Sequence, residues 1–218
     1  MAEINSQINI DIPMCGRFSL RNTASIASKF DVEVEPNFNI VPSDDILTMT
    51  RSTDLMRWGF NPHWARVPIN LINARYETLR EKPSFRESKR CLILADGWYE
   101  WSKQESLKAP YYFHANDDIL FFAGIYADSN YGKGCAIVTT RASENISMIH
   151  HRMPLLINPI NLKDWLEGFD DTETYEKKTD IAYHRVSTLV NSPNNNSEGC
   201  TIPVVLTPAN GQTEFSLK

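Results

Sequence analysis

The sequence predicts a single α+β domain with many strands and few helices. Its 218 residues fall in the range of one large domain or two small ones, and they can bury a sizeable core. Short apolar runs bounded by turn-forming residues outnumber the stretches with helical periodicity. The chain has no internal repeat, and no stretch is rich enough in Pro, Gly or Ser to separate two domains. We therefore expect one mixed domain.

The N-terminal half predicts mainly strands. Its apolar runs predict strands at residues 46–50, 54–60, 91–95 and 98–101. A bulge or turn at residues 96–97 separates the last two strands. Side chains alternate along a strand, so Glu100 is expected on the same face as Trp98. Tyr99 and Trp101 then point to the opposite face.

The C-terminal half adds further strands, at residues 111–114, 120–126, 135–140, 155–157 and 182–189. Three helices complete the prediction. Asn22 and Thr23 can cap a first helix that runs to Phe30. A short helix or turn is expected at residues 145–149, and a third helix at 161–168 ends at Gly168. The acidic residues 170–180 are expected to be exposed, and residues 191–199 read as a loop.

Composition limits the possible functions. Hydrophobic residues make up 42% of the chain, which is typical of a globular protein. The net charge of −5 argues against a generic nucleic-acid binder. However, Lys and Arg outnumber Asp and Glu between Arg51 and Lys108. This basic middle is compatible with an anionic-ligand groove and equally with surface salt bridges.

The cysteines indicate neither a zinc site nor a disulfide scaffold, because Cys15, Cys91, Cys135 and Cys200 lie far apart and form no C-x-x-C pair. The first thirteen residues contain no Lys or Arg, unlike a secretory signal. No apolar run reaches the roughly 20 residues of a membrane span. We therefore expect a protein without membrane attachment that is located in a reducing cytoplasm.

Residues 14–18 are the most distinctive stretch for chemistry. If the chain began at Cys15, this residue would carry a free α-amine beside its thiol. Such a 1,2-aminothiol condenses with an aldehyde and closes to a thiazolidine ring. The alternative interpretation is a small buried residue that leads into a first strand.

Three other polar residues interrupt apolar surroundings: Asn73, Glu100 and His150. A carboxylate among aromatic side chains loses hydration, so the pKa of Glu100 should rise toward a range useful for proton transfer. A histidine can act as an acid or a base near neutral pH. Each residue alone also has a structural explanation. The aromatic residues 58–64 are similarly ambiguous between a small core beneath a loop and a stacking platform for bases.

Together, six ordered motifs resemble the SOS response-associated peptidase (SRAP) family, whose members cross-link themselves to abasic sites in DNA. The motifs are residues 14–18 (MCGRF), 38–42 (FNIVP), 58–60 (WGF), 72–78 (INARYET), 95–101 (ADGWYEW) and 150–154 (HHRMP). The resemblance implies an SRAP-type domain over residues 14–207, with mostly antiparallel strands in a twisted sheet or open barrel and a few flanking helices. Residues 1–13 would be a leader that is removed or precedes the native start, and residues 208–218 a tail.

The resemblance also implies a set of catalytic residues. The α-amine of Cys15 would attack the aldehyde of a ring-opened abasic sugar, and its thiol would close the thiazolidine. Asn73 would hold the sugar or the cysteine terminus. Glu100 would carry protons during imine formation, and His150 would assist opening of the sugar ring. No metal and no cofactor are implied.

The implied partner is single-stranded DNA that contains abasic sites, bound by a monomer that would be nucleoid-associated in a bacterium. Arginines suit phosphate contacts, and aromatic residues suit stacking on bases. The DNA-contacting residues implied by the resemblance are Arg17, Asn39, Pro42, Trp58, Phe60, Trp64, Arg75, Arg86, Thr139 and His184.

The chain departs from the family pattern because thirteen residues precede Met14. With these residues attached, Cys15 has no free amine and thiazolidine chemistry is impossible. Either translation starts at Met14, or the leader is cut off, and the family's proposed autopeptidase activity is one route to that removal. Two other functions stay open: a cysteine-type peptidase acting on other peptides, and a non-catalytic module that binds single-stranded DNA.

Overall fold

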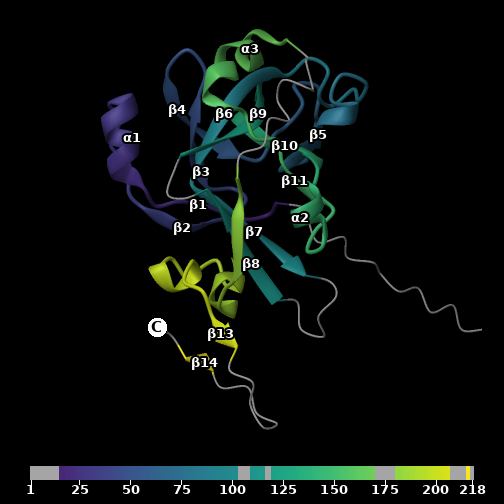
Figure 1. Cartoon of the computed structure of the whole chain (residues 1–218). Coiled ribbons are helices and arrows are strands. Elements are labelled where there is room, and N and C mark those ends of the chain that lie inside the picture. The colour runs from purple at the N-terminus through teal and green to yellow at the C-terminus, as the bar shows by residue number, and fades with distance from the viewer. Residues whose placement is uncertain (1–14, 103–108, 116–118, 170–179, 207–214, 217–218) are drawn as a thin grey trace, which may run out of the picture.

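The computed structural model describes residues 15–102, 109–115, 119–169, 180–206 and 215–216 (Figure 1). The described chain folds into two main sheets with few helices, which confirms the predicted α+β class. The predicted leader, most of the acidic stretch at 170–180 and most of the tail lie outside the described residues. The proposed domain bounds therefore stay predictions.

The larger sheet closes into a barrel. Its strand pairs run β10–β4, β4–β3, β3–β6, β6–β9 and β9–β10, so the last pair returns to the first strand. β5 and β11 pair with the C-terminal end of β10, beyond this ring. The bounds are β3 Asp45–Met49, β4 Thr53–Trp58, β5 Asn73–Arg75, β6 Lys89–Ala95, β9 Leu120–Ser129, β10 Gly132–Arg141 and β11 Arg152–Pro154.

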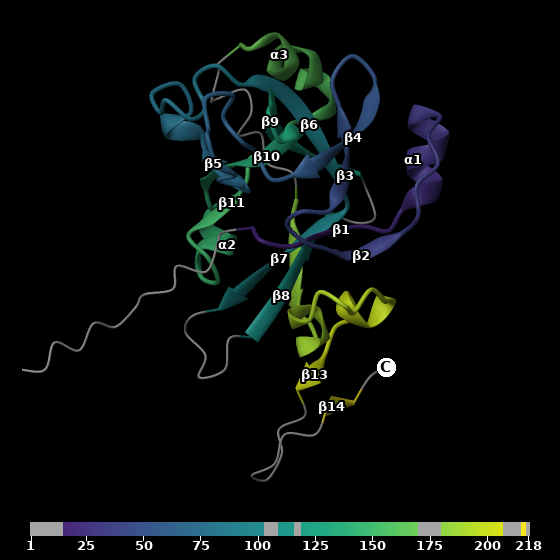
Figure 2. The ribbon, with the colours of Figure 1, turned by 180° about the vertical axis from the view of Figure 1, so that it is seen from behind.

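The smaller sheet is antiparallel and has the strand order β12-β8-β7-β1-β2. Its bounds are β1 Phe18–Leu20, β2 Asn37–Ile40, β7 Gly97–Ser102, β8 Ala109–His114 and β12 Ala182–Arg185. β6 belongs to the barrel and β7 to this sheet, so the turn at Asp96 joins the two. A short pair, β13 Val205–Leu206 and β14 Phe215–Ser216, lies at the opposite end of the molecule from α3 (Figures 1 and 2).

The helices follow the predicted caps. α1 (Thr23–Phe30) begins where Asn22 accepts a hydrogen bond from the Ser25 backbone N–H at 3.3 Å. α3 (Leu162–Glu167) ends at Gly168, whose φ of 89° is favourable for glycine. The remaining helical elements are α2 Glu144–Ser147, η1 Tyr76–Thr78, η2 Pro159–Asn161, η3 Thr188–Asn191 and η4 Glu198–Cys200.

Two strand predictions are wrong in position. Residues 155–157 do not form a strand; they follow β11 and make only an isolated antiparallel bridge to β9, between Leu156 and Phe122. The strand predicted at 182–189 ends at Arg185, where pairing with β8 stops and the chain turns into η3.

β7 lies between two hydrophobic clusters. Trp98 stacks on Phe113, with 5.1 Å between ring centroids, in the main core. Tyr99 packs on Tyr112 in a second, smaller cluster, which Trp101 also contacts. The alternation predicted for this strand is therefore confirmed. The side chain of Glu100 points to the same side of β7 as that of Trp98, toward the main core and Cys15.

The buried carboxylate of Asp96, in the turn between β6 and β7, links β1 to the β7–β8 hairpin. Asp96 accepts hydrogen bonds from the Ser19 hydroxyl at 2.6 Å and from the Asn22 backbone N–H at 2.8 Å. The Tyr112 hydroxyl lies 2.8 Å from that of Ser19. Because buried polar groups are costly unless hydrogen-bonded, this network fixes the strand that closely follows Cys15.

Packing at the start of β7 leaves no room for a side chain. A Cβ atom added at Gly97 would lie 2.3 Å from the Tyr112 ring. We expect Gly97→Ala to lower the free energy of unfolding by about 1–3 kcal/mol, as overpacking usually does. Gly59→Ala is the matched control, because its added Cβ would meet Asn70 at 3.5 Å, an ordinary contact. Urea denaturation followed by tryptophan fluorescence measures both; equal stability of the two variants would contradict this packing constraint.

Candidate active site

Cys15 lies shortly before β1 and is 1% exposed. Its φ of 45° is in the left-handed region, which non-glycine residues rarely adopt. β1 pairs with β7 through Phe18 and Trp98. This pairing carries the chain past β7 and brings Cys15 next to Glu100.

Glu100 holds both heteroatoms of Cys15. Its Oε1 accepts hydrogen bonds from the Cys15 backbone nitrogen and from the Cys15 Sγ, each at 3.0 Å. Glu100 is 3% exposed. One buried carboxylate oxygen is thus shared by the backbone nitrogen and the thiol of Cys15.

His150 lies on the other side of the same carboxylate. Its Nδ1 is 3.6 Å from Glu100 Oε2 and 3.2 Å from the backbone carbonyl oxygen of Arg152. His150 is buried and follows α2, where its backbone N–H donates to the Ile146 carbonyl at 3.1 Å. The structure therefore brings Cys15, Glu100 and His150 together.

Arg152 anchors the histidine segment. Its guanidinium donates two hydrogen bonds to Glu77, at 2.6 and 3.0 Å, and another to the Thr139 hydroxyl at 3.1 Å. Burial alone would raise the pKa of Glu77, but the hydrogen bonds and positive charge of Arg152 outweigh it and lower that pKa. The bidentate pair joins η1 to β11 and fixes the backbone beside His150.

The thiol of Cys15 is held in its neutral form. Burial raises its pKa well above the usual value, and the nearby Glu100 raises it further, while Arg152 has a smaller opposing effect. A cysteine that acts as a free thiolate needs the opposite environment. Glu100, whose Oε1 accepts the hydrogen bond of this thiol, is the group placed to accept its proton.

Asn73 begins β5 and is half-buried, and it lies opposite Ile137 of β10. Arg75, at the end of the same strand, is exposed. Arg86 and Trp64 are also exposed, and the indole nitrogen of Trp64 donates to the Pro83 carbonyl at 3.4 Å. Arg75, Arg86 and Trp64 are therefore accessible for contacts with DNA.

Trp58 and Phe60 do not form a stacking platform. Both lie in the main core, where Trp58 packs on Phe18 and Phe60 on Phe85. The indole nitrogen of Trp58 donates to the Ile72 carbonyl at 2.9 Å. The predicted base-stacking role of these two residues is corrected to a core role, because neither exposes a ring face.

Arg17 and Asn39 both donate hydrogen bonds to backbone carbonyls of residues 190–195. The Arg17 guanidinium donates to Asn39, to the Val190 carbonyl and to the Asn191 carbonyl. The Asn39 amide donates to the carbonyls of Ser192 and Asn195. Asn39 is 3% exposed, so its predicted DNA contact is corrected to a structural one. Arg17 is half-buried and keeps accessible surface, so its predicted DNA contact stays a prediction.

Three other predicted DNA contacts differ in exposure. Thr139 is buried against Arg152, and His184 Nε2 lies 2.7 Å from the Thr201 carbonyl oxygen. The burial of Thr139 corrects its predicted DNA contact to a structural role, whereas His184 is half-buried and its predicted contact stays a prediction. Pro42 is half-buried beside the β2 end and keeps some accessible surface.

Arg152 and Glu77 were not predicted as part of the site. Arg152 stands two positions after His150, and Glu77 stands four positions after Asn73, each inside the same motif as that predicted catalytic residue. A charge pair is not visible in sequence when its members are 75 positions apart. The only pattern in the sequence that could have indicated them is that two of the six motifs carry residues of opposite charge, Glu77 in one and Arg152 in the other.

The fold and site define a β-rich protein in which a buried cysteine near the amino end shares a carboxylate with a histidine. Residues 14–193 match the family model described as SOS response associated peptidase (SRAP). This match covers most of the chain, and the chain belongs to that family.

Several relatives are similar over most of this chain. The abasic site processing protein YoqW of Bacillus subtilis is 37% identical over 217 aligned residues, which cover 84% of this chain and 97% of YoqW. The abasic site processing protein HMCES of Gallus gallus is 33% identical over an alignment that covers 69% of this chain and 57% of HMCES. A protein from Bacteroides thetaiotaomicron of solved structure has a TM-score of 0.75 at 22% identity, covering 88% of this chain and 100% of its own, which supports the fold alone.

Two negative findings concern the described part of the chain. No helix there is long and apolar enough to cross a membrane. No group of three or more His, Cys, Asp or Glu side chains there is placed to hold a metal ion.

The lowered pKa of Glu77 predicts a pH-dependent contribution to stability. A carboxylate whose folded pKa lies below its unfolded value stabilises the fold above the unfolded pKa and loses that effect as the pH falls through the folded pKa. We expect Glu77→Gln to cost about 1–2 kcal/mol at neutral pH, as for a hydrogen bond between charged groups. The cost should shrink in acid. Urea denaturation of both proteins at about pH 7 and about pH 3 tests this; an equal cost at both pH values would refute it.

Proposed function

We propose that this chain forms a covalent cross-link with abasic sites in single-stranded DNA, using Cys15 as its amino-terminal residue. One observation carries the proposal: the nitrogen and the sulfur of Cys15 both lie 3.0 Å from one oxygen of Glu100. The names of the relatives as abasic site processing proteins support the same substrate.

The proposed reaction joins both atoms of Cys15 to one carbon. The α-amine adds to the C1′ aldehyde of the ring-opened sugar, and loss of water gives an imine. The sulfur then adds to the imine carbon, and the thiol proton ends on the nitrogen. The product is a thiazolidine, and no oxidant or cofactor is consumed.

Glu100 is suited to carry protons in each step. It can take a proton from the attacking amine, return it to the departing water and accept the thiol proton as sulfur adds. Because burial keeps the thiol protonated, the amine attacks first and the sulfur second. This order disfavours a general cysteine peptidase, which requires a ready thiolate.

His150 and Asn73 complete the proposed site. His150 lies at the second oxygen of Glu100, where it can exchange a proton with the sugar hydroxyl during ring opening. Asn73 would hold the sugar. Arg75 and Arg86 would contact phosphates, which positions a strand without reading its sequence, and Trp64 would stack on a neighbouring base.

Removal of the first fourteen residues is the second part of the proposal. While Met14 is attached, the Cys15 nitrogen is an amide and cannot form an imine. The Cys15 sulfur would attack the Met14 carbonyl carbon, the C–N bond would break, and water would hydrolyse the resulting thioester. Glu100, which is hydrogen-bonded to both the thiol and the leaving nitrogen, would accept the thiol proton as the sulfur attacks and deliver it to that nitrogen. The unfavourable φ of Cys15 adds strain next to this bond.

A non-catalytic DNA-binding module is the alternative. It would use the exposed Trp64, Arg75 and Arg86 and would have no need for the Cys15–Glu100 contact. Cys15→Ala separates the two functions, because it abolishes a covalent product but leaves noncovalent binding unchanged.

The cross-linking proposal predicts a graded set of variants. Protein that starts at Cys15 should form a heat-stable product with an abasic single-stranded oligonucleotide, and Cys15→Ala should form none. Glu100→Gln should slow the reaction by about 10²–10⁴-fold, the usual contribution of a proton carrier. His150→Gln should also slow it. Denaturing gel electrophoresis over time measures these rates.

His151→Gln is the matched control, because His151 is exposed and adjacent to His150. It should retain the full rate. Borohydride trapping of an added amine confirms that the oligonucleotide carries a reactive aldehyde. Failure of the Cys15 form to react with such DNA would refute the proposal.

Leader removal predicts a change in intact mass. Protein expressed from Met1 should lose residues 1–14, and Glu100→Gln should retain them because the leaving nitrogen is no longer protonated efficiently. Intact-mass spectrometry distinguishes the two forms. An unprocessed wild-type protein, or a processed Glu100→Gln variant, would contradict self-removal, while the cross-linking test on the Cys15 form stands independently.

A further inference from the structure

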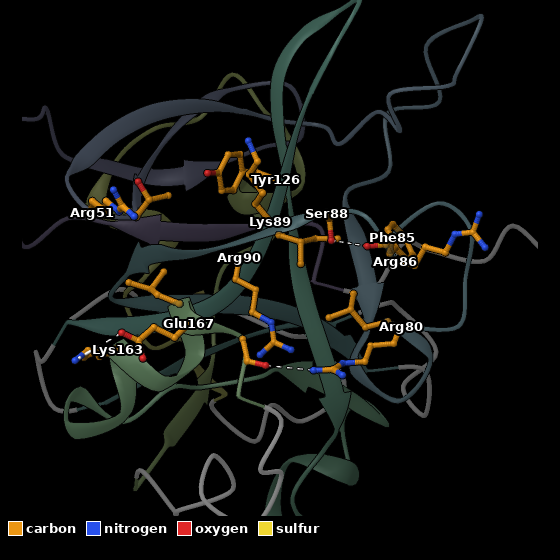
Figure 3. A pocket seen from close by; sticks show the side chains of 15 residues that line it. Arg51, Arg80, Phe85, Arg86, Ser88, Lys89, Arg90, Tyr126, Lys163 and Glu167 are labelled. Carbon is orange, nitrogen blue, oxygen red and sulfur yellow. Dashed lines mark hydrogen bonds and ion pairs between the residues drawn. The ribbon is translucent and has the colours of Figure 1, made fainter.

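A basic pocket lies outside the site described above. Its volume is about 820 Å³, and it lies between α3, β6, β9 and the segment after η1 (Figure 3). Neither Cys15, Glu100 nor His150 lines it. Six cationic side chains line it: Arg51, Arg80, Arg86, Lys89, Arg90 and Lys163.

The cations come from separate parts of the chain. Arg51 follows β3, Arg80 follows η1, and Lys163 lies on α3. Figure 3 shows Arg51 and Lys163 on one side of the pocket and Arg80 on the opposite side, with Arg90 between them. The fold thus gathers positive charge here although the whole chain carries −5. Local concentration of one charge in a concave surface raises the local density of counter-ions.

Two of the arginines are preplaced by the fold. The Arg90 guanidinium lies 4.2 Å from the centre of the Trp165 ring and donates to the Phe169 carbonyl at 3.1 Å. Arg80 donates to the Gly168 carbonyl at 3.2 Å. A guanidinium held in place loses less conformational freedom when it binds an anion.

Among the residues that the structure describes, the lysines of the pocket form weak, exposed pairs with acidic groups. Glu167 is the one acidic side chain among the described lining residues, and it lies 3.6 Å from Lys163. Lys89 lies 3.7 Å from Asp128. Exposed pairs of this kind contribute about 0–1 kcal/mol, so their lysines can exchange to a bound anion.

The pocket also has an apolar side. Leu79, Phe85, Ile125 and Leu166 line it, and all but Leu166 are buried. Small-molecule sites are typically about 300–1,000 Å³ with apolar walls and a few charged groups. This pocket is therefore larger than one phosphate needs, and its half-buried Leu166 and Tyr126 offer surface to a sugar or a base.

We propose that this pocket binds a phosphate ester of a nucleotide unit, with Arg51, Arg80 and Arg90 contacting the phosphate. The planar guanidinium fork matches phosphate oxygens, and the apolar wall contacts the rest of the nucleotide. Two sources share this chemistry: a free nucleotide, and the backbone of a DNA strand that extends beyond the lesion. Arg86, which the cross-linking proposal assigns to phosphate contacts, also lines the pocket, but the present proposal rests on Arg51, Arg80 and Arg90, which that reaction does not use.

The experiment measures noncovalent binding by the full chain. Two probes are used: fluorescein-labelled undamaged oligo-dT, followed by anisotropy, and ATP, followed by calorimetry. Arg51→Glu and Arg80→Glu replace exposed side chains on opposite sides of the pocket. Lys29→Glu makes the same charge change at an exposed position of α1, away from the pocket. Circular dichroism confirms that the variants are folded.

Each pocket variant should weaken binding at least tenfold, and Lys29→Glu should not. The slope of log affinity against log salt should fall by about 1 for each phosphate that the variant no longer neutralises. Weaker ATP binding by the pocket variants identifies a free nucleotide, whereas an effect confined to oligo-dT identifies a strand. The proposal is overturned if neither probe binds, if the pocket variants bind both probes as the wild type does, or if Lys29→Glu weakens binding equally. Cross-linking of abasic DNA by the same variants is scored separately.

Discussion

The buried carboxylate of Glu100 is the constraint around which the site is built. A buried carboxyl group is costly unless its oxygens are hydrogen-bonded. Here the Cys15 nitrogen and sulfur satisfy one oxygen, and His150 faces the other. The position of β7 between two hydrophobic clusters fixes the direction in which this carboxylate points. The contacts that satisfy the buried Glu100 side chain are therefore the same contacts that the proposed reaction needs.

The supports of this carboxylate lie on several elements. Asp96 binds the strand after Cys15, and the Arg152–Glu77 pair fixes the backbone beside His150. A reacting group gains most when it is held close to its reactive geometry before the substrate arrives. These supports position the proposed proton carriers without contacting the substrate. The basic pocket is a separate feature, held by α3 and the barrel strands.

The sequence alone predicts the fold class, the capping residues of α1 and α3, and the side of β7 to which Glu100 points. Each of these depends on local periodicity or local turn chemistry. The family resemblance also predicted a shared site for Cys15, Glu100 and His150, and the fold brings these three residues together. Other assignments depended on partners far along the chain. Arg17 and Asn39 are engaged by a loop more than 150 residues away, and Trp58 and Phe60 are enclosed by barrel closure. The Arg152–Glu77 pair was missed for the same reason, since no local pattern reports a long-range contact.

The central claim is that both nucleophilic atoms of Cys15 bond to one carbon of the abasic sugar. Tandem mass spectrometry of the protease-digested cross-link tests this directly. We expect an adduct on Cys15 whose mass is that of the peptide plus the sugar remnant less one water, unchanged by borohydride or iodoacetamide. An adduct that gains two hydrogens from borohydride, that retains an alkylatable thiol on Cys15, or that maps to another residue would contradict the account.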